Sequence, residues 1–153
     1  RGCRRRSFRL VETLQDLATP DTLLVLAAEE VPVGRYSLEF FDLAAADAAF
    51  DSGFKKAVLA NVVSYEENVR SVLNKVALGE ADAGIVYTSD LVGVEGVSSL
   101  EIPDVLNILA EYPIAPLNDS AQPDAAATFV DLVLSAEGQA VLAEYGFGPA
   151  AGE

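Results

Sequence analysis

The amino-acid sequence predicts an α/β domain with a mainly parallel sheet. An apolar run at 22–28, bounded by turn residues, is typical of a buried parallel strand. An amphipathic helical pattern at 64–80 leads directly into a second apolar run at 83–87. A strand, then helices, then another strand is the order of the crossover connection that joins parallel strands.

The first third of the chain supplies the first strand and the helices on either side of it. Residues 12–19 have helical spacing, and Pro20 ends them. The strand at 22–28 follows, then a loop at 29–34 and a helix at 35–50. We therefore expect the strand to enter a helix through a short loop that contains proline and glycine.

The middle of the chain contains the clearest helix. A shorter helix at about 54–60 leads into 61–64, which we interpret as a short strand or an extended link. In the segment 64–80, five apolar residues recur at the spacing of one helix face: Val69, Val72, Leu73, Val76 and Ala77. Gly79 fits the position just after the end of this helix.

The start of this helix has two interpretations. Ser64 and Glu67 match a capping box, which would start the helix near residue 65. The amide of Val69 would then already be bonded within the helix. We favour a later start, with the N-cap in 66–68, which leaves that amide free.

Three further segments are expected to be extended. We predict a strand buried on both faces at 83–87, which ends in a tyrosine, and another strand at 97–103. The segment 111–117 is also extended, but Pro113 and Pro116 confine it to a sheet edge or a hinge.

The chain is helical again near its C-terminus. The segment 122–135 carries a stripe of apolar residues on one helix face: Ala126, Phe129, Val130 and Val133. A second helix begins at Ser135, whose cap involves either Gly138 or Gln139, and it ends before Gly146.

The composition excludes several kinds of chemistry. With no His and a single Cys, the chain cannot form a His- or Cys-based metal site, a Ser-His-Asp triad, a Cys-His dyad or an intramolecular disulfide. Carboxylate chemistry survives this elimination, but nothing in the sequence argues for it, so we expect neither an enzyme nor a metal coordinated by side chains. No apolar run approaches the roughly 18 residues of a membrane span, so we expect no direct membrane insertion.

The net charge of −14 is unevenly distributed. Five of the ten basic residues lie within the first nine positions, so the rest carries five basic against 24 acidic residues, a balance of −19. Such a body repels nucleic acid and anionic membranes. The arginine cluster could be a nucleic-acid-binding arm, but we favour a disordered or artefactual start.

Three points along the chain could hold a ligand. In open parallel sheets, ligands gather beyond the carboxyl ends of the strands, where loops lead into helices. The turn at 32–34, the start of the helix near Val69 and the hydroxyl of Tyr87 meet this description. They offer neutral donors to an anion. Each also has a purely structural interpretation, as a turn, a capping box and a residue at the core edge.

A resemblance to a known family favours the ligand interpretation. The segments "EEVPVGRYSLE", "VVSYEENVRSVLNKVALGEADAGIVYTSD", "EYPIAPL" and "FVDLVLSAEGQAVLAEYGFGP" resemble the periplasmic molybdate-binding proteins of ABC transporters, over about 11–149. The resemblance implies a type II periplasmic-binding fold of two α/β lobes. It also implies that neutral donors grip molybdate or tungstate, with the backbone amides of Val33 and Val69 and the hydroxyl of Tyr87 among them.

The resemblance also implies an organisation for the chain. Residues 1–10 would be the atypical basic start, 11–110 the second lobe, and 111–153 the hinge-return strand and C-terminal helices. Family members begin with about a lobe of sequence that is not found here, so we expect an N-terminally truncated chain with impaired binding. We expect a monomer that delivers its oxyanion to an ABC permease, without a cofactor and without binding nucleic acid. It would be periplasmic or extracellular and membrane-associated, its signal sequence being absent from this chain.

Two other functions remain open. Transcription regulators reuse this lobe architecture, so the chain could be the effector-sensing domain of a regulator. It could also belong to a binding protein for another oxyanion, such as sulfate or phosphate.

Overall fold

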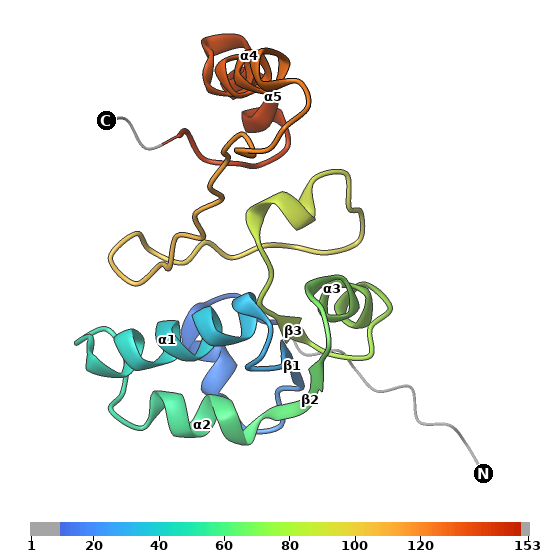
Figure 1. Cartoon of the computed structure of the whole chain (residues 1–153). Coiled ribbons are helices and arrows are strands. Elements are labelled where there is room, and N and C mark those ends of the chain that lie inside the picture. Colours follow the sequence, from blue (N-terminus) through green and yellow to red (C-terminus); the bar gives the residue numbers. More distant parts are fainter. Residues whose placement is uncertain (1–9, 151–153) are drawn as a thin grey trace. The chain divides into compact units, whose positions relative to one another are not determined.

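A computed structural model describes residues 10–150, so residues 1–9 of the expected basic start lie outside the described residues. The chain divides into two compact units, Arg1–Ile108 and Leu109–Glu153. The first contains the sheet and its flanking helices, and the second contains two further helices (Figure 1).

The first unit is built on a three-stranded parallel sheet. Its strands are β1 (Leu24–Ala27), β2 (Val62–Glu66) and β3 (Ala83–Gly84), in the order β2-β1-β3. Both pairings are parallel, which confirms the α/β class with a parallel sheet. All four residues of β1 are buried, because the strand is paired on both edges and covered on both faces.

Helices cover the two faces of this sheet (Figure 1). The 3-10 helix η1 (Leu14–Ala18), α1 (Pro32–Ala46) and α2 (Phe54–Ala60) pack on one face, and α3 (Val69–Ala77) packs on the other.

Successive side chains of β1 enter two separate clusters, because side chains alternate between the faces of a strand. Leu24 and Leu26 pack with the phenylalanines of α1 and α2. Val25 and Ala27 pack with Val72 of α3 and with Ala81. We call this second group (Val25, Ala27, Val33, Val72 and Ala81) the α3-side cluster.

Helix α1 occupies a different range from the one that we expected. It begins at Pro32 instead of residue 35 and ends at Ala46. Proline suits the first turn of a helix because its missing N–H has no partner there in any case. The predicted loop at 29–34 is therefore shorter, and Val33 lies inside the helix. Helix α2 has the predicted range.

Helix α3 has the later start that we favoured. Its N-cap is Asn68, whose side-chain oxygen accepts a hydrogen bond from the Ser71 amide at 2.9 Å. The capping box based on Ser64 is wrong, because Ser64 lies within β2. Gly79, just after the helix, has a φ of 71°, a left-handed conformation that favours glycine.

Two predicted strands differ in the structure. β3 has only two residues, and the chain from 85 to 87 is half-buried and irregular, so a strand buried on both faces through 87 is wrong. Residues 97–103 are mostly exposed and form no strand. An apolar pattern makes a strand only where another strand pairs with it. The structure shows no such partner for either segment among residues 10–150.

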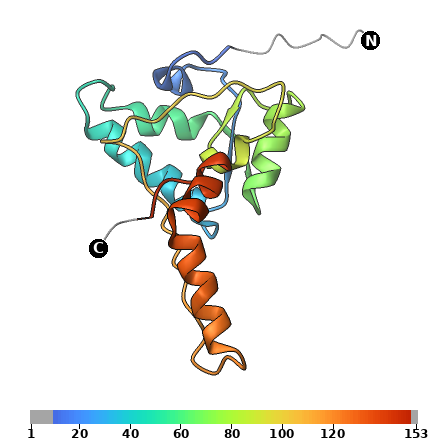
Figure 2. The same cartoon turned by 90° about the horizontal axis from the view of Figure 1, so that it is seen from above.

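The second unit contains α4 (Pro123–Leu134) and α5 (Ala136–Glu144). Ser135 separates them, and its hydroxyl accepts a hydrogen bond from the Gly138 amide at 3.2 Å, the first of the two predicted caps. The two helices meet at a bend of 63° (Figure 2). Within the described residues, no single helix is long and apolar enough to cross a membrane. The bent pair α4 and α5 reaches that length and apolarity only when the two helices are counted together.

Candidate functional site

The three residues predicted to bind a ligand gather around one hydrophobic cluster. Val33 is itself a buried member of the α3-side cluster, and Val69 and Tyr87 pack against it. Val33 comes from the first turn of α1, Val69 from the first residue of α3, and Tyr87 from the segment after β3. Three segments that are distant in sequence therefore meet on the α3 side of the sheet.

The backbone amide of Val33 is an available donor. The amides of Gly34 and Arg35 both bond to the Val31 carbonyl, at 2.9 and 3.3 Å. Val33 is the second residue of α1, and at that position no carbonyl lies one turn earlier within the helix. The buried hydroxyl of Ser37 donates to the Val33 carbonyl at 2.7 Å and so helps to fix this first turn.

Gly34 allows α1 to begin against the end of β1. A Cβ atom at this position would lie 2.7 Å from the Ala27 carbonyl oxygen and closer still to that of Ala28. Real Cβ atoms do not approach a backbone oxygen this closely. The glycine is therefore required by the close approach of helix and strand, which also positions the Val33 amide.

The backbone amide of Val69 is also an available donor at the start of a helix. Val69 is the first residue of α3, so its N–H has no carbonyl partner within the helix. The Asn68 cap satisfies the Ser71 amide, two residues further on. The helix start therefore keeps a donor at the position where the sequence predicts one.

Tyr87 precedes a short 3-10 helix, η2 (Thr88–Leu91), and is half-buried. Its amide donates to the Asp90 carboxylate at 3.1 Å, which ties the backbone of Tyr87 to η2. The tyrosine thus follows the short β3 after a few residues, rather than ending a long strand as predicted. Its ring packs on the same cluster as Val33 and Val69.

Lys75 of α3 forms an ion pair with Glu66 of β2. The Lys75 ammonium lies 2.5 Å from the Glu66 carboxylate and 3.1 Å from the Ser64 hydroxyl, which itself donates to Glu66 at 2.8 Å. The hydrogen bond from Lys75, followed by that from Ser64, lowers the pKa of Glu66 below its ordinary value. This network joins the end of β2 to α3.

Two arginines and the acidic residues of the chain are further possible ligand or metal contacts. The side chains of Arg35 and Arg70 are exposed, as expected for charges on solvated helix faces. In the described part of the chain, no group of three His, Cys, Asp or Glu residues comes together in a way that could hold a metal ion.

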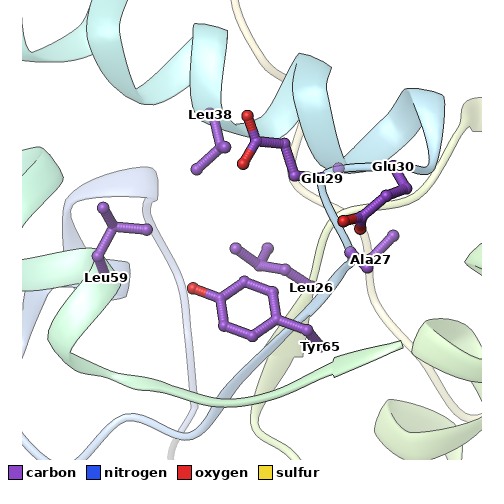
Figure 3. A pocket seen from close by; sticks show the side chains of 9 residues that line it. Leu26, Ala27, Glu29, Glu30, Leu38, Leu59 and Tyr65 are labelled. Atoms are coloured by element: carbon purple, nitrogen blue, oxygen red, sulfur yellow. The ribbon is translucent and has the colours of Figure 1, made fainter. Parts of the chain in front are cut away.

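A pocket of about 340 Å³ lies beside α1 and α2, and none of the three predicted residues lines it (Figure 3). Its lining comes from β1, the following turn, α1, α2 and β2: Leu26, Ala27, Ala28, Glu29, Glu30, Gly34, Leu38, Leu59 and Tyr65. No pattern in the sequence predicted this pocket. The only local signal was the adjacent pair of glutamates directly after a buried strand.

Known proteins resemble this chain over most of its length. Residues 6–148 match the family model described as bacterial extracellular solute-binding protein. The molybdate-binding protein ModA of Mycobacterium tuberculosis is 33% identical over 138 residues, which cover 90% of this chain and 48% of ModA. The putative ABC transporter substrate-binding lipoprotein YvgL of Bacillus subtilis is 27% identical over 139 residues, which cover 90% of this chain and 50% of YvgL.

A solved structure shares the fold. The substrate-binding domain of a putative molybdenum ABC transporter from Clostridium difficile superposes with a TM-score of 0.76 at 27% identity, covering 92% of this chain and 59% of that one. The chain spans about half the length of the curated relatives that it matches.

Proposed function

The chain belongs to the bacterial extracellular solute-binding protein family, and from this membership we propose that it captures a tetrahedral oxyanion, molybdate or tungstate, for an ABC permease. The relatives named for molybdate and molybdenum support this choice of ligand. The observation that carries the proposal is the meeting of Val33, Val69 and Tyr87 around the α3-side cluster. The protein would act outside the cytoplasm, in the periplasm or at the cell exterior, as a monomer without catalytic activity.

We assign three donors to the oxyanion: the backbone amides of Val33 and Val69 and the hydroxyl of Tyr87. Both amides lie in the first turn of a helix, where the helix dipole also favours negative charge. Neutral donors suit this purpose because a dianion held by them needs no neighbouring lysine or arginine. The pairing of Lys75 with Glu66 is consistent with such a site.

The acidity of the chain does not prevent anion binding. The net charge of −14 repels an anion at long range, but mobile ions screen this repulsion beyond roughly 8 Å at physiological salt. A hydrogen bond to a charged group contributes about 1.5–3 kcal/mol at contact. Local donors therefore outweigh the distant field. Three donors leave part of the anion without hydrogen bonds, so any further donor should raise the affinity.

Isothermal titration of the chain with molybdate, tungstate and sulfate tests the proposal. We expect heat with molybdate and tungstate, and a loss of about tenfold in molybdate affinity in Tyr87→Phe, because one hydrogen bond to the anion is removed. Tyr36→Phe is the matched control, since Tyr36 is a half-buried tyrosine that does not pack on the α3-side cluster.

Three results would count against the proposal. No heat with any oxyanion would exclude binding by this chain. An undiminished affinity in Tyr87→Phe would remove the tyrosine from the site. Equal affinity for sulfate and molybdate would favour a binding protein for a smaller oxyanion.

A further inference from the structure

We propose that the pocket beside α1 and α2 is a docking site for an arginine side chain presented by a partner polypeptide. Two glutamates, an exposed tyrosine ring and an aliphatic floor meet there (Figure 3). The pocket shares Ala27 and Gly34 with the surroundings of Val33, but none of the three predicted oxyanion donors lines it, and the proposal does not depend on the proposed function. Its volume of about 340 Å³ is at the lower end for ligand pockets, which suits a single long side chain.

The interior of the pocket is suited to the alkyl part of such a side chain. Leu26 of β1, Leu38 of α1 and Leu59 of α2 all form part of the lining. Leu26 is fully buried, whereas the other two leucines are half-buried. An arginine stem would therefore contact aliphatic side chains while its guanidinium stays near solvent, the usual arrangement for this amphipathic residue.

The charged residues of the pocket favour a cation. Glu29 and Glu30 are exposed, and no basic residue lines the pocket within residues 10–150. Neither glutamate has an ion-pair partner in the described part of the chain. The chain as a whole carries a net charge of −14, which would speed the approach of a basic partner.

The exposed ring of Tyr65 favours arginine as the bound cation. The exposed apolar surface beside it favours a polypeptide as the molecule that carries this arginine. The Tyr65 side chain is 57% exposed at the pocket, so a planar guanidinium can stack on its ring. Val63, two residues earlier in β2, is 53% exposed. A polypeptide offers apolar residues beside its arginine that could cover such neighbouring surface, and a small free cation does not.

The test uses the whole chain and a capped pentapeptide, acetyl-Gly-Leu-Arg-Leu-Gly-amide, titrated by isothermal calorimetry. A peptide with citrulline in place of arginine keeps the shape but loses the charge. We expect the citrulline peptide, and the double variant Glu29→Gln/Glu30→Gln with the arginine peptide, each to lose about five- to tenfold in affinity. Tyr65→Ser should also weaken binding, and the double variant Glu12→Gln/Glu39→Gln, an equal charge change at two exposed sites outside the pocket, should not.

Several outcomes would overturn the proposal. Equal binding of the citrulline peptide would remove the role of charge, and an equal loss in Glu12→Gln/Glu39→Gln would assign the effect to the overall field. Butylguanidine binding as tightly as the peptide would identify a small-molecule site instead. Glutamates just before a helix can also stabilise its dipole. If the double variant lowers the melting temperature and leaves peptide affinity unchanged, that structural role replaces the proposed one.

Discussion

Gly34 lies where the first turn of α1 touches the end of β1, and its missing side chain has a structural purpose. The carbonyl oxygens of Ala27 and Ala28 occupy the space that a Cβ atom would need. Because the Val33 amide precedes this contact directly, one backbone approach fixes both the packing of the helix and the direction of a candidate donor.

We therefore expect Gly34→Ala to destabilise the protein by about 1–3 kcal/mol, the range for overpacking in a tight interior. Urea denaturation followed by circular dichroism measures this change. Gly148→Ala serves as the control, because a Cβ atom there would have no other heavy atom within 4 Å. Equal stability of the two variants would show that α1 can move away from β1 at little cost.

At the scale of secondary-structure elements, an ion pair connects β2 to α3. Lys75 in the last turn of α3 reaches back to Glu66 at the end of β2, and Ser64 completes the network. A cation near a helix C-terminus is also favourable for the helix dipole. The network thus connects the edge strand with the helix that covers the α3 side of the sheet.

This connection should make stability depend on pH. The pKa of Glu66 is lower in the folded protein than its ordinary value of 4.5, so the ionised carboxylate favours folding. The contribution is fully present above pH 4.5 and is lost as the pH falls through the lowered folded pKa. Because Lys75 is partly exposed, we expect less than about 1 kcal/mol.

The comparison of Glu66→Gln with the parent chain in urea at pH 7 and at pH 3 measures this contribution. The variant should be less stable at pH 7, and the difference should shrink at pH 3. Glu67→Gln is the matched control, since Glu67 is the adjacent residue and its side chain is exposed. A stability difference that is the same at both pH values would contradict the role of the ionised carboxylate.

On the scale of the whole molecule, the net negative charge of the protein repels the proposed anionic ligand. Sites that bind anions through lysine or arginine lose affinity as salt is added. The donors that we propose are neutral and the protein is acidic, so added salt should screen mainly the repulsion.

We therefore expect molybdate affinity to rise slightly, by up to about twofold, between low and physiological ionic strength. Calorimetric titration at the two salt concentrations measures this, with sodium chloride as the added salt. A fall in affinity would indicate that a cationic side chain contacts the anion. That result would direct attention to Arg35 and Arg70, the arginines near the two helix starts.

The sequence alone determined the features that depend on neighbouring residues. The buried run of β1, the helical period of α3, Gly79 after that helix and the Ser135 cap follow from local pattern and backbone chemistry. The same patterns predicted Val33, Val69 and Tyr87 as candidates, and the quoted segments suggested a family.

Only the tertiary structure decided where strands end and which residues meet. β3 stops after two residues and 97–103 forms no strand, because a strand exists only where another one supplies its hydrogen-bond partners. The gathering of three distant segments on the α3-side cluster, and the pocket around Tyr65, likewise depend on packing across the sheet. No local pattern encodes such contacts, since they join residues that are far apart in the chain.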